Sequence, residues 1–238
     1  MGARTVFKRY ELKYLLTRDQ KDAVSEAMKP HMQPDIYGRT TIRNLYFDTD
    51  NYRLIRHSIE KPVYKEKLRI RSYAQADADS PVFVELKKKF DCVVYKRRIE
   101  VSEQEAMAWL CEGQGCAESQ ISREIDYFLS YYGSLHPTVF LSYDREAYYN
   151  LEEADFRVTF DGNILCRQED LSLRMDVGGA PLLPEDTCLM EIKCSGGIPL
   201  WMTHVLAKEK IYKTSFSKYG TAYEKLIYPK LKEEALYA

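Results

Sequence analysis

Alternating polar and apolar residues at positions 65–71 and 82–89 give this sequence its clearest structural signal. The first stretch reads Lys-Glu-Lys-Leu-Arg-Ile-Arg, and the second reads Val-Phe-Val-Glu-Leu-Lys-Lys-Lys. Successive side chains of an extended strand point to opposite faces of its sheet. The cations of the first stretch therefore share one face, and its leucine and isoleucine share the other. Residues 93–101 alternate in the same way, so we predict three neighbouring strands with one cationic face and one apolar face.

Similar patterns predict the remaining elements and an antiparallel α+β fold. Capping residues and breakers mark the helix ends, as at Thr17, Pro30, Ser102 and Gly133. Further strands are expected at residues 7–15, 40–47, 137–145, 155–165 and 189–194. Helices are expected at residues 17–29, 102–111, 119–131, 199–208 and 217–228, with a short helix after Asp48 and a turn or bulge at 162–163. A chain of 238 residues with these elements is expected to form a single domain over residues 1–238.

The charged faces of the predicted strands carry far more positive than negative charge. Collecting them gives twelve cations and five carboxylates, an excess of seven, in a chain whose formal net charge is only -1. The cations are Arg9, Lys13, Lys67, Arg69, Arg71, Lys87, Lys89, Lys96, Arg98, Arg145, Arg157 and Lys193, and the carboxylates are Glu11, Glu85, Glu100, Asp161 and Glu191. One interpretation is the solvated face of an antiparallel sheet. The other is a binding surface for an anion, because repeated like charges repel unless a counter-charge lies between them.

The composition of the chain argues against several classes of function. The near-neutral total gives no general basic surface, so nucleic acid is not the expected partner. The six cysteines form no CxxC pair and the four histidines have no ligand-like spacing, so we expect no zinc site and no disulfide framework. No apolar run reaches the roughly 20 residues that span a membrane, and the N-terminus lacks a signal-peptide pattern. We therefore expect a cytoplasmic protein without a membrane segment.

If the cationic faces turn inward, the sheet would form a barrel. About eight antiparallel strands enclose a space just wide enough for long side chains and one slender ligand, with the helices packed outside. Arginine forks suit phosphate oxygens, and carboxylates among them suit Mg²⁺ or Mn²⁺. Glu85 and Glu191 are the candidate metal ligands, although Glu85 is equally well explained as an ion-pair partner of Arg69 or Lys87. The chain has neither a Walker loop nor a kinase glycine-rich loop, so side chains would hold the phosphates.

Six motifs in order resemble one known family. They are Lys67-Leu68-Arg69-Ile70-Arg71, Phe83-Val84-Glu85-Leu86-Lys87, Ser142-Tyr143-Asp144-Arg145, Arg157-Val158-Thr159-Phe160-Asp161, Met190-Glu191-Ile192-Lys193 and Ser215-Phe216-Ser217-Lys218-Tyr219. Together they resemble the VTC domain, the polyphosphate polymerase domain of the triphosphate tunnel metalloenzyme superfamily, over about residues 7–228. The resemblance implies a tunnel that binds nucleoside triphosphate or inorganic polyphosphate with Mn²⁺ or Mg²⁺.

Site residues follow from the resemblance by position. It implies phosphate binding by Lys13, Arg69, Arg71, Lys87, Lys96, Arg145, Arg157, Lys193, Ser217 and Lys218. Glu191 would bind the metal, and Arg69, Arg71, Lys218 and Glu191 would take part in catalysis. Ser217 and Lys218 would stand at the start of the last helix, where backbone N–H groups favour anions.

Three functions stay open at this stage. The first is phosphoryl transfer, most simply extension of polyphosphate from ATP or cleavage of a triphosphate. The second is a non-catalytic polyphosphate or nucleotide sensor, and the third is an RNA 5′-triphosphatase. The first strand keeps only Glu11 and Lys13 where the CYTH branch carries two glutamates and a lysine, which argues against the cyclase and thiamine-triphosphatase types. The chain also lacks the phosphate-sensing domain and membrane helices of the eukaryotic polymerase, and it has Ser215 where that enzyme has a lysine.

Overall fold

The computed structural model describes residues 10–91, 93–152 and 155–237, and it shows an α+β chain built on antiparallel strands. The expected residues Phe7 and Arg9 of the first strand, and Cys92, lie outside the described part. Within the described residues, eleven strands form one sheet with the hydrogen-bonded order β11-β1-β10-β8-β7-β3-β4-β5-β6, while β2 pairs with β7 and β9 pairs with β8. No strand pairing in this part joins β11 to β6. The antiparallel α+β class is confirmed, and the closed barrel of about eight strands stays a prediction.

By the density of its contacts the chain divides into two compact units, each assembled from separate segments. The first comprises residues 1–40, 143–164 and 183–216, and the second comprises 41–142, 165–182 and 217–238. The single domain over residues 1–238 that the sequence led us to expect stays a prediction.

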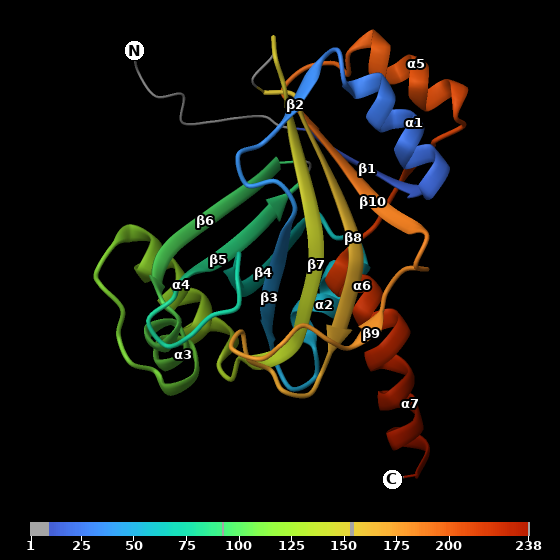
Figure 1. Ribbon diagram of the computed structural model, residues 1–238. Helices are drawn as coiled ribbons and strands as arrows, with labels where there is room; N and C mark the ends of the chain where they lie inside the picture. The colour runs from blue at the N-terminus through green and yellow to red at the C-terminus, as the bar shows by residue number, and fades with distance from the viewer. Residues whose placement is uncertain (1–9, 92, 153–154, 238) are drawn as a thin grey trace. The chain divides into compact units, whose positions relative to one another are not determined.

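The first unit contains a strand pair covered by two helices, α1 and α5, which lie side by side (Figure 1). Thr17 caps α1 as expected: its hydroxyl accepts the Gln20 N–H while the Gln20 side chain accepts the Thr17 N–H. Side chains from the strands and both helices, including Leu16, Val24, Ile192 and Met202, share one buried core. The elements of this unit are β1 (Tyr10–Thr17), α1 (Arg18–Met28), β2 (Met32–Pro34), β10 (Thr187–Cys194), α5 (Leu200–Lys208) and β11 (Lys213–Thr214), with parts of β7 (His136–Asn150) and β8 (Arg157–Arg167).

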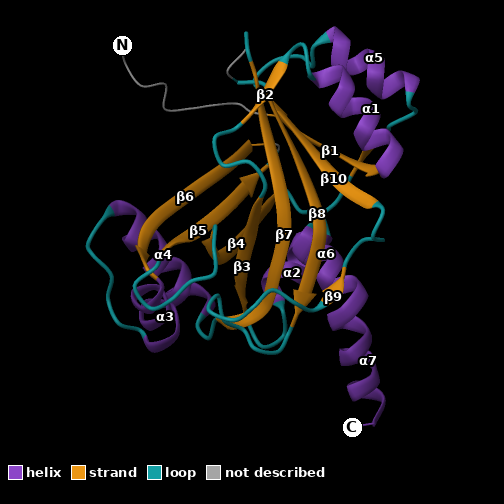
Figure 2. Cartoon of the chain, viewed as in Figure 1, coloured by secondary structure: helices purple, strands orange, loops and turns teal. Residues whose placement is uncertain are grey.

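The second unit contains the meander of three strands predicted from the alternating pattern. Helices α3 and α4 pack against it, as the purple helices beside the orange strands in Figure 2 show. Gly113 ends α3 with a φ of 71°, a left-handed conformation that glycine adopts without strain. The elements are β3 (Thr40–Asp48), α2 (Arg53–Ile59), β4 (Tyr64–Ser72), β5 (Pro81–Phe90), β6 (Val93–Ser102), α3 (Glu103–Glu112), α4 (Gln120–Tyr132), β9 (Ala180–Pro181), α6 (Lys218–Ala222), the π-helix η1 (Tyr223–Ile227) and α7 (Tyr228–Tyr237).

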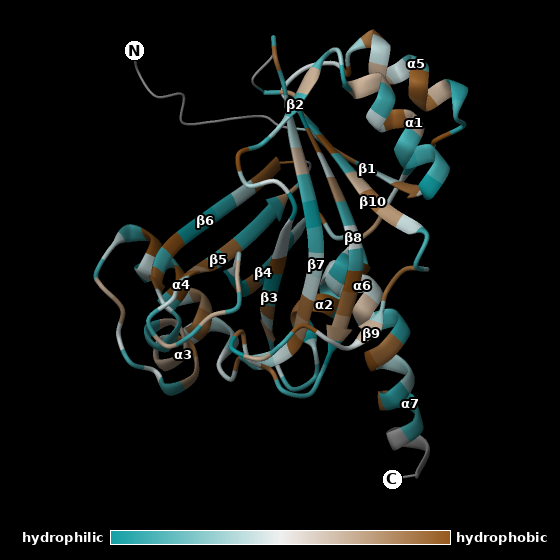
Figure 3. Ribbon diagram, viewed as in Figure 1, coloured by the Kyte–Doolittle hydropathy of each residue, from teal (hydrophilic) through white to brown (hydrophobic). Residues whose placement is uncertain are grey.

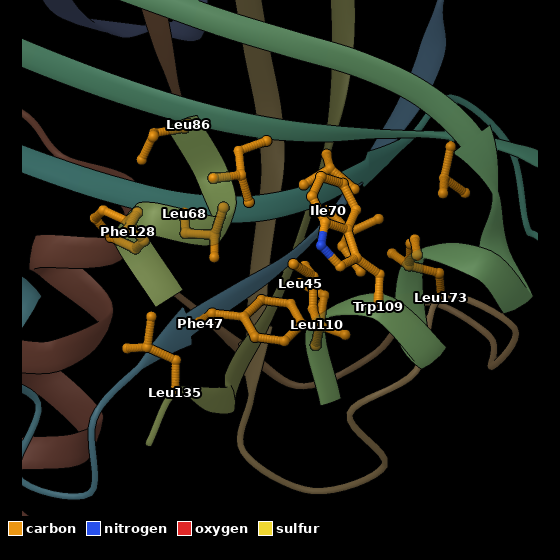
Figure 4. Close-up of a cluster of buried hydrophobic side chains, with 14 of the residues drawn as sticks. Leu45, Phe47, Leu68, Ile70, Leu86, Trp109, Leu110, Phe128, Leu135 and Leu173 are labelled. Carbon is orange, nitrogen blue, oxygen red and sulfur yellow. The ribbon is translucent and has the colours of Figure 1, made fainter. Parts of the chain in front are cut away.

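The apolar face of this meander forms the core of the second unit. Leu68, Ile70 and Leu86 are fully buried, and they lie against Trp109 of α3 and Phe128 of α4 (Figure 4). Burying one large apolar side chain contributes about 1.5–3 kcal/mol. The face of each strand that the alternation predicted to be apolar is therefore the face that the helices cover. Hydrophilic residues also occur along β5 and β6 (Figure 3).

Two details differ from the sequence expectation. The last helix is longer and less regular than residues 217–228, because a π-helical turn at Tyr223–Ile227 joins α6 to α7. Of the turn or bulge expected at residues 162–163, the turn is wrong, because β8 continues through both residues. The bulge stays a prediction, and Asn163 has a φ of 47° inside the strand. The sequence signals for the short strands β2, β9 and β11 were too brief to predict them.

Asp48 fixes the short helix α2 onto the end of β3. Its carboxylate is fully buried and accepts the N–H groups of Leu54 at 2.8 Å and Ile55 at 2.9 Å, and the Tyr219 hydroxyl at 3.0 Å. Burial raises the pKa of this carboxyl, although these hydrogen bonds oppose the rise. The short helix expected after Asp48 is thus confirmed as α2, although its N-cap residue is Tyr52.

Replacing Asp48 with alanine is expected to lower the free energy of unfolding by roughly 3 kcal/mol, because buried donors at the start of α2 lose their acceptor. Urea unfolding followed by circular dichroism measures this loss. Asp50→Ala is the matched control, since the Asp50 side chain is 85% exposed, and it should change stability by less than about 0.5 kcal/mol. Equal effects of the two substitutions would contradict the role of Asp48.

Candidate functional site

The polar face of the β4–β5–β6 meander places like charges directly opposite one another. The pairing registers align three lysines in one cross-strand row and an arginine, a glutamate and an arginine in the next. Like charges directly opposite on a sheet destabilise it, so the lysine row favours a partner of opposite charge. The first row is Lys67, Lys87 and Lys96, and the second is Arg69, Glu85 and Arg98. These six residues and Arg71 are called the Arg69 cluster below.

Glu85 lies at the centre of the Arg69 cluster and is only 1% exposed. Arg69 donates Nε and Nη2 to Glu85 Oε2 at 2.9 and 2.7 Å, and Lys96 Nζ lies 2.5 Å from Oε1. Burial by itself would raise the pKa of Glu85, but the charges of Arg69, Arg71 and Lys96 outweigh it and lower the pKa to about 2. Glu85 is therefore not a solvated side chain of this face. The structure supports the alternative expected from the sequence, in which Glu85 is an ion-pair partner of Arg69.

Neutral side chains behind the two arginines hold them in position. Tyr46 accepts a hydrogen bond from Arg69 Nη1 at 2.9 Å. Arg71 is 7% exposed and donates Nε to Asn44 Oδ1 at 3.0 Å, while Asn44 donates its amide to the Leu141 carbonyl at 3.1 Å. The sequence reasoning missed Asn44, although a polar residue inside the apolar run of β3 was an available signal. Arginines fixed in this way present their remaining N–H groups at defined positions.

Ser217 connects the start of α6 with Lys67. Lys67 Nζ donates to Ser217 Oγ at 3.0 Å, and the same oxygen accepts the Gly220 N–H at 3.1 Å. The Lys67 ammonium also lies 5.9 Å from the ring centroid of Tyr219. Lys218 begins α6, which has five residues. The phosphate-binding roles expected for Ser217, Lys218 and Lys87 stay predictions.

The first unit carries its own charged group, centred on Glu191 in β10. Glu191 is 6% exposed, and its carboxylate oxygens lie 3.4 Å from Lys13 Nζ, 3.4 Å from Arg145 Nη2 and 3.8 Å from Lys193 Nζ. Lys13 also donates to the Phe216 carbonyl at 3.0 Å. We call Lys13, Arg145, Asp161, Glu191 and Lys193 the Glu191 cluster.

Arg145 is bound most tightly to Asp161 rather than to Glu191. Its Nε and Nη2 donate to the two carboxylate oxygens of Asp161 at 2.6 and 2.7 Å, and Asp161 is fully buried. Burial disfavours the Arg145 charge, but Tyr143, Asp161 and Glu191 outweigh it and raise the pKa of the guanidinium. Arg145 therefore stays charged. Asp161 entered the sequence reasoning as part of the charged face and of one family motif, but not as a partner of Arg145, because that pairing depends on strand register.

The predicted residues thus separate into two groups. Arg69, Arg71, Lys87 and Lys96 lie together around Glu85 in the second unit, where Ser217 and Lys218 also belong. Lys13, Arg145 and Lys193 lie around Glu191 in the first unit, with Arg157 exposed at the first residue of β8, opposite Lys193. A tunnel lined by all of them stays a prediction.

The carboxylates of the two clusters differ as metal donors. Among the described residues no group of three or more His, Cys, Asp or Glu side chains is placed to hold a metal ion. Mg²⁺ and Mn²⁺ nevertheless often take one or two carboxylates and complete their shell with water and substrate phosphates. Glu191 fits that mode better than Glu85, because its oxygens lie 3.4–3.8 Å from the cations of the Glu191 cluster, whereas contacts of 2.5–2.9 Å engage both oxygens of Glu85.

Glu85 should make the stability of the protein depend on pH. Its pKa falls from an ordinary 4.5 to about 2 on folding, so ionised Glu85 stabilises the fold above pH 4.5. That contribution, roughly 3 kcal/mol, is lost as pH falls toward 2. Urea midpoints of the wild type and Glu85→Gln, measured from pH 6 to pH 2, should therefore converge at the acid end. A gap that stays constant over this range would show that the Glu85 charge is not responsible.

Comparisons with known proteins identify the family. The VTC domain matches residues 8–227, nearly the whole chain. The chain belongs to the VTC domain family. This VTC domain also resembles a solved structure from Bacillus halodurans that is provisionally described as an adenylate cyclase, with 16% sequence identity, a TM-score of 0.54, and coverage of 87% of this chain and 92% of that one.

A second solved structure has the same provisional description and comes from Vibrio parahaemolyticus. It shares 11% identity with a TM-score of 0.46, and the match covers 90% of this chain and 97% of that one. The Bacillus likeness supports the fold of this VTC domain and nothing finer. A comparison with curated proteins gave no match. None of the helices in the described part of the chain combines the length and apolar character that crossing a bilayer requires.

Proposed function

We propose that this VTC domain binds the phosphates of a nucleoside triphosphate or of inorganic polyphosphate and transfers a phosphoryl group with a divalent metal. The most specific form of the proposal is a polyphosphate polymerase. The family match over residues 8–227 and the order of the six motifs support a nucleotide or polyphosphate ligand. The observation that carries the proposal is the Arg69 cluster.

The Arg69 cluster gathers six cations around one buried carboxylate. Glu85 offsets only one of these charges, so the cluster favours an anion with several closely spaced charges. Phosphate oxygens accept paired N–H groups from arginine, and these charge-assisted bonds are stronger than neutral ones. Arg69 and Arg71 are already oriented by Glu85, Tyr46 and Asn44, so less conformational entropy is lost on binding.

Glu191 is the residue that we assign to the metal. Bound beside phosphate oxygens, Mg²⁺ or Mn²⁺ would neutralise charge that develops on the transferring group. The chain's own part in that arrangement is electrostatic, because Lys13, Arg145 and Lys193 surround the Glu191 carboxylate with positive charge. Asp161 holds the Arg145 guanidinium in place.

Catalysis by this chain would come mainly from positioning. Arg69 and Arg71 would align the phosphate chain, and Lys218 would place positive charge near the attacked phosphate. Preorganised charges lower the barrier because they do not have to reorient as charge develops. No covalent intermediate on the protein is needed for such a transfer.

One assay on one preparation tests the proposal. The protein is incubated with Mn²⁺ and ATP, tripolyphosphate or triphosphorylated RNA, and both polyphosphate and released phosphate are measured. Polyphosphate made from ATP supports the polymerase, and phosphate released from tripolyphosphate supports a triphosphatase. Preferential release from RNA would instead support an RNA 5′-triphosphatase. If the protein neither binds nor turns over any of the three substrates, the proposal is refuted.

A non-catalytic sensor is the second candidate. It is favoured by the cation contacts on both Glu85 and Glu191, which leave these carboxylates engaged with the protein's own charges. A sensor should bind tripolyphosphate tightly without turnover in the same assay. Rapid hydrolysis or synthesis would eliminate it.

A further inference from the structure

A pocket lies on the opposite side of the meander from the Arg69 cluster. On β4 and β5, Leu68 and Leu86 point into the core, and Glu66 and Lys88 continue that same face beyond it. There α2, β4, β5 and α4 enclose a pocket of about 490 Å³. This volume is within the range of small-molecule sites. Nothing in the proposed function uses this pocket.

Tyrosines of α4 form one wall of the pocket. Tyr127 and Tyr131 are 71% and 58% exposed, and their rings stack with centroids 6.4 Å apart. Tyr131 also meets Tyr132 edge to face at 4.9 Å, and Phe128 is buried beneath them. Large aromatic rings exposed together at a pocket mark a surface that a flat ligand can cover.

Cationic side chains also line the pocket, beside the tyrosines. Arg53 lies over the rings of Tyr131 and Tyr132, at 6.0 and 5.4 Å from their centroids, and Lys65 and Lys88 also line the pocket. One carboxylate, Glu66, lines the pocket together with these three positive charges.

Glu66 is already engaged within the pocket wall. It accepts the Tyr132 hydroxyl at 3.0 Å and the Tyr64 hydroxyl, and it lies 3.8 Å from Lys88 Nζ. The three cations and the one carboxylate that line the pocket give it a net charge of about +2. The pocket therefore offers stacking surfaces and an excess of positive charge side by side.

We infer that this pocket binds a small anion that carries an aromatic ring, a mononucleotide being the simplest member of that class. The tyrosines would stack on the ring, and Arg53 with Lys65 and Lys88 would contact the anionic group. Stacking on an aromatic side chain is worth about 1–3 kcal/mol per base, so both halves of the ligand contribute. The site is separate from the one proposed for phosphoryl transfer.

The test titrates AMP into the full chain without metal, with adenosine and inorganic phosphate as the two partial ligands. AMP should bind at least about tenfold more tightly than either one, because only AMP has both ring and charge. Tyr131→Ala and Lys88→Ala should each weaken AMP binding by about tenfold and leave tripolyphosphate affinity unchanged. Tyr37→Ala and Lys29→Ala are the matched controls, since both side chains are exposed in the other unit, and neither should change AMP binding.

Arg69→Ala keeps this test independent of the proposed function. AMP binding should survive in that variant, because Arg69 lies on the opposite face of the sheet. No AMP binding, AMP binding that both pocket variants leave unchanged, or phosphate binding as tight as AMP would each overturn the inference. Thermal unfolding of Tyr131→Ala and Lys88→Ala verifies that both variants are folded.

Discussion

Replacing Arg69 with alanine is expected to weaken tripolyphosphate binding by about a hundredfold. The substitution removes a planar donor group that Tyr46 and Glu85 hold in place. Hydrogen bonds to charged groups are worth about 1.5–3 kcal/mol, and each 1.4 kcal/mol is a factor of about ten in affinity. Isothermal titration with tripolyphosphate, at one fixed salt concentration, measures the change.

The control for Arg69 must separate lost binding from lost stability. Removing Arg69 also deprives buried Glu85 of a partner, so the double variant Arg69→Ala with Glu85→Gln removes that unpaired charge. It should recover stability without recovering affinity. Arg123→Ala removes an exposed arginine that pairs with Glu118, and it should leave binding unchanged. An Arg69→Ala protein that is folded and binds tripolyphosphate normally would contradict the assignment.

Glu191→Gln is expected to reduce metal-dependent turnover by about a hundredfold or more, while metal-free binding of tripolyphosphate stays the same or becomes tighter. The amide keeps the shape of the side chain but removes the charge that we assign to the metal. It also removes a negative charge from among Lys13, Arg145 and Lys193, which favours an anionic ligand. The two readouts therefore separate, because turnover falls while metal-free affinity does not.

Phosphate release at several Mn²⁺ concentrations, combined with metal-free titration, checks this pair of effects. Glu146→Gln is the matched control, because Glu146 is a carboxylate of the same unit that pairs with Lys21 on a different site. It should leave both readouts unchanged. If Glu191→Gln turned over at the wild-type rate, Glu191 would not be the metal ligand.

Much of the fold follows from local sequence patterns. The alternation in β4 and β5 predicted which side chains enter the core, since Leu68 and Leu86 are fully buried. The N-cap at Thr17 and the capping box at Ser102 predicted where α1 and α3 begin. These features depend on neighbouring residues alone, so a single sequence contains them.

Other features depend on contacts between distant segments. The two-residue strands β9 and β11 have no periodicity of their own and exist through pairing with β8 and β1. The sequence predicted Glu191 and Arg145 as site residues, but only strand register makes Asp161 the close partner of Arg145. The tyrosine pocket was missed for the same reason, because its walls come from α2, β4, β5 and α4.

The distinction between Glu85 and Glu191 also required the structure. Both glutamates lie among cations in the sequence, and both were candidate metal ligands. Short contacts engage both oxygens of Glu85, whereas Lys13 and Arg145 each lie 3.4 Å from an oxygen of Glu191. Sequence pattern alone does not contain these distances.

The most direct test of phosphate binding by the Arg69 cluster is a crystal structure of the protein soaked with tripolyphosphate and Mn²⁺. Phosphate oxygens are expected within hydrogen-bond distance of the Arg69 and Arg71 guanidinium groups. Well-ordered tripolyphosphate bound elsewhere, with both guanidinium groups contacting only protein atoms, would contradict it.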